Sequence, residues 1–305
     1  DGWAGLGIVV QAYQKRAAAV VEWLGALARA RGVKIALRLV KGAYWDSEVK
    51  RAQVAGLADF PVFTAKLHTD INYLRCAQQL HGFSDCIYPA FATHNAMTIA
   101  YIAALFGRDA DHELQRLHGM GERLHDLVLT DNATRCRIYA PVGAHRDLLA
   151  YLVRRLLENG ANSSFVNRIS DPNVSVDDLV ADPVDVVSAM PVIGTPHDQI
   201  DLPADVFGKD RVNSRGLDLA SESALAMLGA ALTETAAQPW HAKPLLGDGA
   251  EAGERRDVLN PADHADRVGH VTELAASDAS RVVVMAHAAC EAWAAVPPAG
   301  RAACL

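Results

Sequence analysis

Short apolar runs alternate with amphipathic helical patterns over the first half of the chain. Five of these runs have the length and composition of β-strands. They cover residues 7–13, 33–40, 86–94, 114–118 and 137–140. The segments between them repeat apolar residues at helical spacing, most clearly over 16–31. Strands that alternate with helices predict a parallel sheet, because parallel neighbours need a crossover connection.

A further helix is predicted over residues 148–157. Its apolar stripe consists of Leu148, Leu149, Leu152, Val153, Leu156 and Leu157. Asn159-Gly160 follows as a helix stop. The fold class is therefore α/β. Because a closed (β/α)₈ barrel of the TIM type needs eight strands, five runs predict a partial barrel of about five βα units, over residues 1–169.

The second half of the chain has a different composition. Residues 170–216 are rich in Asp and Pro and are interpreted as a linker with one short helix. A second unit is expected over 217–305, where an Ala-rich helix spans 217–236 and a polar, Gly-rich loop spans 240–257. Short strands or turns are expected at 258–261 and 268–271. They precede a helix that is capped by Ser277 and ended by Pro297-Pro298.

Composition and charge narrow the class of protein. The formal net charge of −7 over 305 residues argues against binding of a nucleic-acid backbone by this portion. No apolar run reaches the roughly 18 residues that span a bilayer. The five cysteines are scattered and indicate a reducing compartment, so the expected location is the cytoplasm. The chain begins without Met, which suggests that the natural N-terminus lies upstream.

Three clusters of polar residues follow predicted strands or lie on the last barrel helix. The first begins with Arg38 inside an apolar strand and continues through Lys41, Gly42, Tyr44 and Trp45. An internal salt bridge for Arg38 and a functional role are both open. A lysine beside a glycine at a strand end suits a diphosphate group, and the two aromatic rings could cover a planar ring system.

The second cluster is Thr93-His94-Asn95. His94 could be a metal ligand, a general base, a phosphate donor or a hydrogen-bonded structural histidine. A metal-dependent barrel hydrolase is the alternative function, with His118 and Glu122 as further ligands. That alternative is the weaker one, because nothing in the sequence fixes their geometry.

The third cluster is Arg154-Arg155 with Glu158 one turn later. Arg154 and Glu158 could simply pair on the helix surface. If the helix leans over the barrel mouth, the two guanidinium groups could instead clamp a carboxylate, since their geometry matches it bidentately.

Five ordered strings in the first half resemble the proline dehydrogenase domain of the proline utilization A family, bacterial bifunctional enzymes. The strings span 38–45 (RLVKGAYW), 91–95 (FATHN), 117–122 (LHGMGE), 137–143 (RIYAPVG) and 151–162 (YLVRRLLENGAN). Later strings at 213–219, 259–262 and 293–305 resemble the start of the family's aldehyde dehydrogenase module. The resemblance identifies the chain as an internal part of such a protein.

The resemblance implies a function and a set of site residues. The family's barrel binds FAD and oxidises proline to Δ1-pyrroline-5-carboxylate by hydride transfer to flavin N5. Electrons then pass to membrane quinone, and the second module uses NAD to oxidise glutamate semialdehyde to glutamate. By position, catalytic roles fall to Arg38, Tyr139, Arg154 and Arg155, of which the last three line the proline pocket. Cofactor contacts are implied for Gln11, Arg38, Lys41, Gly42, Trp45, Thr64, His94, Asn95, Leu117 and Glu158, and no metal is implied.

The chain departs from the family pattern in several places. The upstream strands that carry a Lys and an Asp of the proline pocket have no match here. The catalytic Cys, Glu and NAD-binding strands of the second module are also unmatched. We therefore expect this chain alone to be catalytically incomplete, in a parent that forms homo-oligomers and associates peripherally with membranes. Ala90 stands where the family commonly has Gln.

Overall fold

The computed structural model describes residues 5–108, 110–132, 134–160, 168, 171–246 and 253–305, without the side chains of 131–132 and 156–160. The chain divides into two compact units, Asp1–Leu217 and Asp218–Leu305. Each is described by itself below.

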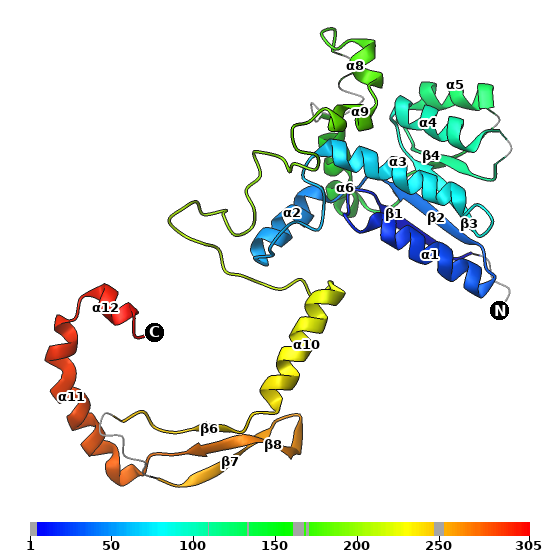
Figure 1. The fold of residues 1–305 in the computed structure, drawn as a ribbon. Helices are drawn as coiled ribbons and strands as arrows, with labels where there is room; N and C mark the ends of the chain where they lie inside the picture. The colour runs from blue at the N-terminus through cyan, green and yellow to red at the C-terminus, as the bar shows by residue number, and fades with distance from the viewer. Residues whose placement is uncertain (1–4, 109, 133, 161–167, 169–170, 247–252) are drawn as a thin grey trace. The chain divides into compact units, whose positions relative to one another are not determined.

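The first unit is built on a five-stranded parallel sheet, as the sequence predicts (Figure 1). The strands are β1 (Gly7–Gln11), β2 (Ile35–Val40), β3 (Ile87–Ala92), β4 (Glu113–Leu117) and β5 (Arg135–Tyr139). They lie in sequence order, so every neighbour is reached by a crossover through a helix. This is the topology of successive βα units in a TIM-type barrel, with β1 and β5 as the edges of the described sheet.

The helices that contribute to the hydrophobic core cover one face of this sheet. The helices of the βα units are α1 (Ala17–Arg31), α2 (Trp45–Val54), α3 (Lys66–Gly82), α4 (Ala96–Phe106), α5 (Glu122–Asn132) and α6 (His145–Gly160). Leu24 of α1, Tyr73 of α3 and Ile102 of α4 are at most 2% exposed and pack against Leu39 and Phe91 of the strands. Each such buried side chain contributes about 1.5–3 kcal/mol relative to exposure. These residues form the core of the unit.

Because successive side chains of a strand point to opposite faces, the other face carries a different set of residues. Arg38, Ala90 and Glu113 occupy one row across β2, β3 and β4. Gln115 and Arg137 pair in the next row, on β4 and β5. The face without the hydrophobic core is therefore polar and charged, and it leads to the carboxyl ends of the strands.

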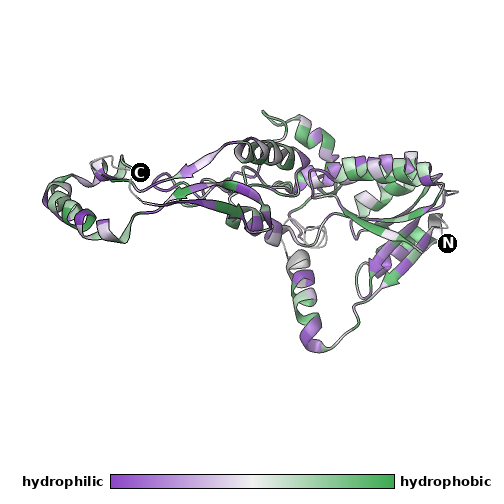
Figure 2. Cartoon of the chain, turned by 90° about the horizontal axis from the view of Figure 1, so that it is seen from below, coloured by the Kyte–Doolittle hydropathy of each residue, from purple (hydrophilic) through white to green (hydrophobic). Residues whose placement is uncertain are grey.

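The ends of two helices follow from local sequence. Gly32 ends α1 in the left-handed conformation (φ 61°), and its N–H donates to carbonyl oxygens of the last turn. Asn95 is the N-cap of α4, and its side chain accepts a hydrogen bond from the backbone N–H of Thr98. Figure 2 shows hydrophobic and hydrophilic positions side by side on the helices, as expected for helices that bury one face.

The segment after α6 runs along the first unit. It contains two short helices, α8 (Val176–Val180) and α9 (Pro183–Ser188), where the sequence predicted one. Further on, the backbone N–H of His197 donates to Thr64 Oγ1 at 3.0 Å. Asn213 Nδ2 donates to the carbonyl oxygen of Gln53 at 2.8 Å. The segment is thus hydrogen-bonded to α2 and to the loop that precedes α3.

The second unit contains a small mixed sheet and three α-helices among its described residues. These elements are α10 (Glu222–Ala236), β6 (Trp240–Ala242), β7 (Arg255–Asn260), β8 (Asp263–Thr272), a 3₁₀ turn η1 (Ala276–Asp278), α11 (Ala279–Ala295) and α12 (Pro298–Ala302). The strands β7 and β8 form an antiparallel hairpin, and β6 pairs with β8 in parallel.

Two local predictions for this unit need correction. The strand β6 lies within the stretch that was expected to be a polar loop. Ser277 lies inside the 3₁₀ turn η1, and α11 begins only at Ala279, after Asp278. A tight turn at Ala276–Asp278 therefore precedes the helix and moves its N-cap from Ser277 to Asp278, by one residue. None of the described helices in either unit has the length and apolar character needed to cross a membrane.

Candidate functional site

The carboxyl ends of the five parallel strands meet at one edge of the sheet. Gln11 ends β1, Leu117 ends β4 and Tyr139 ends β5. Lys41 follows β2 directly, and His94 lies two residues beyond β3. Parallel sheets of this kind bind ligands at this edge, so the predicted residues are brought together where a ligand is expected.

Arg38 links three strands at this edge. Its Nε donates to Gln115 Oε1 on β4 at 2.7 Å. The centre of its guanidinium lies 4.9 Å from the ring centroid of Tyr139 on β5, a cation–π contact. Of the two alternatives for Arg38, the internal salt bridge is absent among the described residues, because Arg38 is hydrogen-bonded to a neutral amide.

Lys41 forms a partly buried ion pair with Asp70 of α3, with side chains that are 24% and 12% exposed. Its Nζ lies 2.5 Å from Asp70 Oδ1, and Lys66 reaches Asp70 Oδ2 at 2.6 Å. Burial lowers the pKa of Lys41, and the nearby carboxylate of Asp70 opposes this shift. The pKa of Asp70 is lowered: burial raises it, but the two lysines outweigh burial. The pair gives this edge a cation of fixed position.

The loop after β2 approaches the end of β1 closely. Gly42 has φ +145°, and a Cβ there would come within 2.4 Å of the Tyr13 ring. The N–H of Ala43 points to Gln11 Oε1 at 3.4 Å. Trp45 Nε1 donates to the carbonyl oxygen of Phe63 at 2.9 Å, which fixes the indole at the start of α2. Only a glycine allows this approach of the loop to Tyr13.

His94 is held as a neutral imidazole. The backbone N–H of Leu117 donates to His94 Nε2 at 3.1 Å, so Nδ1 must carry the proton. Burial lowers the pKa of His94 to about 4, with further lowering by His125, Arg155 and Arg116. His125 in turn lies against the end of β3, with Nε2 3.1 Å from the carbonyl oxygen of Thr93. His94 therefore offers one N–H donor and no charge at neutral pH.

Helix α6 places Arg154 over Tyr44, in the loop that follows β2. The centre of its guanidinium lies 4.8 Å from the ring of Tyr44, and its buried Nε has no hydrogen-bond partner among the described residues. Arg155 lies over the ring of Tyr151 on its own helix, at 5.5 Å. Glu158 lies within α6, but its side chain is outside the described residues. The helix therefore leans over this edge at Arg154.

The metal alternative finds no support in this geometry. The backbone N–H of Leu117 donates to the Nε2 lone pair of His94, so this lone pair is not available to a metal ion. Glu122 pairs with Arg116 at 3.3 Å. His118 is fixed through its backbone, whose N–H donates to the Tyr139 carbonyl oxygen at 2.8 Å. In the part of the chain that the structure describes, no group of three or more His, Cys, Asp or Glu side chains could hold a metal ion.

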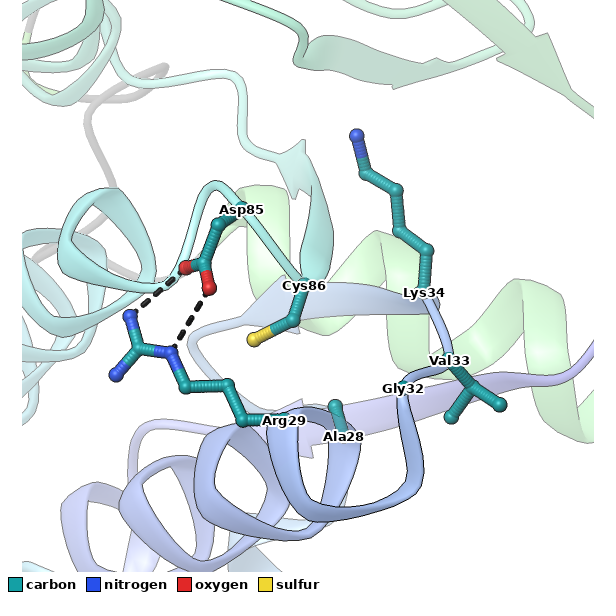
Figure 3. A pocket seen from close by; sticks show the side chains of 7 residues that line it. All are labelled: Ala28, Arg29, Gly32, Val33, Lys34, Asp85 and Cys86. Atoms are coloured by element: carbon teal, nitrogen blue, oxygen red, sulfur yellow. Dashed lines mark hydrogen bonds and ion pairs between the residues drawn. The ribbon is translucent and has the colours of Figure 1, made fainter.

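A hollow of about 370 Å³ opens at the opposite end of the sheet, where β2 and β3 begin (Figure 3). It is lined by Ala28, Arg29, Gly32, Val33, Lys34, Asp85 and Cys86. Arg29 pairs bidentately with Asp85 at 2.8 and 2.9 Å, and Lys34 pairs with Asp111 at 3.0 Å. Both cations are neutralised by carboxylates of the protein. We therefore interpret this hollow, at the amino ends of the strands, as structural and not as a ligand site.

Sequence reasoning missed several residues of this edge. Asp70 pairs with Lys41, and Gln115 and Glu113 lie behind Arg38. The alternation Glu113-x-Gln115 inside a strand was an available signal, because buried polar residues need partners. Asp70 gave no such signal, since it lies on a helix whose exposed and buried faces both contain polar residues.

Together the fold and the site define a class. A parallel α/β sheet presents cations and a neutral histidine N–H donor at its carboxyl edge, which suits an anionic ligand. A family model described as "Proline dehydrogenase" matches residues 1–168, more than half of the chain. The chain belongs to the proline dehydrogenase family.

Relatives of known sequence agree. "Bifunctional protein PutA" of Rhizobium meliloti is 57% identical over 278 residues, which cover 90% of this chain and 23% of that protein. "Bifunctional protein PutA" of Escherichia coli (strain K12) is 50% identical over 316 residues, covering 100% of this chain and 24% of that protein. The chain thus spans about a quarter of the length of these relatives.

Solved structures agree as well. A crystal structure of bifunctional proline utilization A (PutA) is similar with a TM-score of 0.72 at 50% identity, over 80% of this chain and 24% of that one. The PutA from Bdellovibrio bacteriovorus inactivated by N-propargylglycine is similar with a TM-score of 0.74 at 32% identity, over 97% of this chain and 30% of that one. The five-stranded parallel sheet is consistent with part of the TIM-like barrel of PutA.

Proposed function

We propose that the first unit is the flavin-facing part of a proline dehydrogenase that oxidises L-proline to Δ1-pyrroline-5-carboxylate with FAD. The observation that carries this proposal is the state of Arg38. It is anchored through Nε, and among the described residues neither of its Nη groups makes a hydrogen bond. Both Nη groups are therefore available to donate hydrogen bonds at the ligand-binding edge of the sheet, and such a guanidinium suits an electron-rich ligand.

The residues of this edge fit a flavin dinucleotide. Arg38 turns two Nη groups without hydrogen bonds among the described residues to this edge, Lys41 supplies a cation, and His94 presents a neutral Nδ1–H donor. When bound, FAD supplies the two-electron acceptor for the oxidation. Arg38 would stabilise the negative charge that arrives at the edge of the flavin ring, and electrostatic stabilisation of this kind is often the largest contribution to lowering a barrier.

Other side chains would hold the remainder of the cofactor. Lys41, fixed by Asp70, would neutralise the diphosphate, and His94 would donate Nδ1–H to the same region. Gln11 and Trp45 would contact the isoalloxazine and the dinucleotide. Further contacts are assigned to Gly42, Thr64, Asn95, Leu117 and Glu158.

Proline would lie between the flavin and α6. Arg154 and Arg155 would bind its carboxylate, since guanidinium groups pair with carboxylates bidentately. Tyr139, whose ring already lies against Arg38, would close one wall of the pocket. In the reaction the C5–H bond of proline would break and its hydride would go to the two-electron acceptor that FAD supplies. The ring nitrogen would lose its proton, and a C5=N bond would form.

The second unit would belong to the start of an NAD-dependent aldehyde dehydrogenase module. In the parent protein that module would oxidise glutamate semialdehyde to glutamate, and quinone at the membrane surface would accept electrons from the flavin. The similarity to bifunctional PutA relatives supports this assignment. The parent protein would also form a homo-oligomer.

The test uses the full-length parent protein, because this chain alone is expected to be catalytically incomplete. It combines a flavin spectrum with proline-dependent reduction of a dye. We expect bound FAD and turnover with proline. A protein without flavin and without proline-dependent dye reduction would overturn the proposal. A colourless protein that contains a stoichiometric metal would favour the hydrolase alternative.

A further inference from the structure

Arg38 reaches across a whole strand to meet its partner. Arg38 on β2 is in register with Ala90 on β3, and Ala90 is in register with Glu113 on β4. Neighbouring strands lie about 4.8 Å apart, so the guanidinium must extend over β3 to contact β4. Ala90 is 4% exposed, and its methyl group is the smallest side chain that a non-glycine residue can place there. The small residue leaves the passage through which Arg38 Nε meets Gln115 Oε1 at 2.7 Å.

The orientation of the Gln115 amide is fixed from the other side. Its Nε2 donates to Glu113 Oε1 at 2.6 Å, so its oxygen has to face Arg38. A flipped amide would place its NH₂ against the guanidinium N–H and its oxygen against the carboxylate. Both contacts would then be repulsive. Gln115 is 8% exposed, so water cannot readily compensate for the loss.

Glu113 is itself held by two further groups. Arg137 binds it with Nε and Nη2, both at 2.9 Å, and the Tyr88 hydroxyl donates to Oε2 at 3.1 Å. Burial opposes ionisation of this 4%-exposed carboxyl, but hydrogen bonds from Arg137 and Gln115 outweigh it and lower the pKa of Glu113. The carboxylate therefore stays charged at neutral pH and accepts a hydrogen bond from the Gln115 NH₂ group.

We propose that Gln115 is a positioning residue: Glu113 fixes its amide, and the amide fixes the Arg38 guanidinium so that both Nη groups are directed to the flavin. This rests on the proposed function. The order of the chain of contacts is Arg137, Glu113, Gln115 and Arg38, and it spans three of the five strands. Tyr139 limits the guanidinium from the β5 side.

The decisive variant is Gln115→Met, which keeps length and volume but removes both hydrogen bonds. Gln79→Met is the matched control, because it makes the same substitution on α3, a helix of the opposite, core-side layer of the unit. Both variants are made in the full-length parent protein. Three quantities are measured for each: thermal unfolding without flavin, the FAD dissociation constant, and the reduction potential of the bound flavin.

We expect Gln115→Met to weaken FAD binding about tenfold, as expected for one lost hydrogen bond to a charged group. The reduction potential should shift to more negative values, since a displaced cation stabilises the reduced flavin less. Gln79→Met should leave both quantities at the wild-type values. A potential and an FAD affinity in Gln115→Met equal to those of the wild type would overturn the proposal, because a purely structural Gln115 would not change the potential.

Glu113→Gln provides a second route if Gln115→Met does not fold. It removes the charge that selects the amide orientation, so the potential should shift in the same direction by a smaller amount. An unchanged potential in a folded Glu113→Gln protein would also count against the proposal. Failure of the proposed function is read separately, on the wild type, as a protein that neither binds FAD nor oxidises proline.

Discussion

His94 and Leu117 connect two neighbouring strand ends: the Leu117 N–H donates to His94 Nε2 at 3.1 Å. The bond ties the loop after β3 to the last residue of β4. It also selects the tautomer of His94 and, with burial, keeps the ring neutral. A residue that the sequence leaves open between metal ligand, base and phosphate donor is thus restricted to a neutral N–H donor.

This restriction predicts a pH dependence of stability. The pKa of His94 is lowered to about 4 from 6.5, chiefly by burial, so the folded state disfavours the imidazolium. Its contribution is fully present above pH 6.5 and is lost as the pH falls towards 4, by about 3 kcal/mol in total. We expect His94→Gln to remove that part of the pH dependence in urea unfolding between pH 7 and 4. His118→Gln, at an exposed position, is the control. Identical pH profiles of His94→Gln and wild type would contradict the prediction.

Asp70 should matter more than an ordinary surface acid. In Asp70→Asn the partly buried ammonium of Lys41 loses its partner and faces Lys66. For this degree of burial we expect a cost of about 2–4 kcal/mol at pH 7. The loss should shrink towards pH 10, because Lys41 has a lowered pKa and can then become neutral. Unfolding in urea at both pH values measures this.

Asp59→Asn is its matched control. Asp59 pairs with Lys15, but both side chains are largely exposed, so the loss should stay below about 1 kcal/mol. Equal effects of the two substitutions would show that burial of the Lys41 pair has no energetic consequence.

Gly42 is expected to tolerate no side chain. Gly42→Ala places a Cβ 2.4 Å from the Tyr13 ring at φ +145°, so Tyr13 or the loop must move. We expect a loss of about 2–4 kcal/mol in unfolding free energy. Gly32→Ala is the control: its φ is +61°, but no atom lies within 4 Å of the added Cβ, so only backbone strain of about 1 kcal/mol remains. A ranking with Gly32→Ala as the costlier change would refute this reading.

The segment that follows α9 should depend on Asn213. Asn213 Nδ2 donates to the carbonyl oxygens of Gln53 and Pro203, at 2.8 and 2.9 Å. Asn213→Ala should cost about 1–2 kcal/mol and speed proteolysis near residues 197–216. Asn173→Ala, which breaks only an exposed local bond to Asp171, should leave the cleavage rate there unchanged.

Arg154 should act on proline affinity. Under the proposed function, Arg154→Met removes a guanidinium from the substrate carboxylate, and we expect KM for proline to rise about 10–100-fold. Arg146→Met, at an exposed position near the start of the same helix, should leave KM unchanged. An unchanged KM in Arg154→Met would exclude a carboxylate contact of this residue.

The sequence by itself determined the architecture of the first unit. All five strand runs became strands of one parallel sheet, and the helical segments 16–31 and 148–157 became α1 and α6. The reason is that periodicity is a local property of the sequence. An apolar run between two helical patterns can be placed in few ways other than as a strand of a parallel sheet, because each helix serves as a crossover. The clustering of Lys41, His94 and Tyr139 at one edge follows from parallelism alone.

Only the tertiary structure decided which side chains meet. Arg38 and Gln115 are 77 residues apart, and Thr64 and His197 are 133 apart. No local pattern joins such residues, because their contact depends on strand register and on how far each side chain reaches. In the second unit, the sequence did not predict β6, which lies in a segment expected to be a polar loop. Trp240–Ala242 pairs through its backbone and its side chains are exposed, so it has no apolar pattern. The periodicity of a sequence reflects which side chains are buried. It contains no information on which backbone segments pair or in which register.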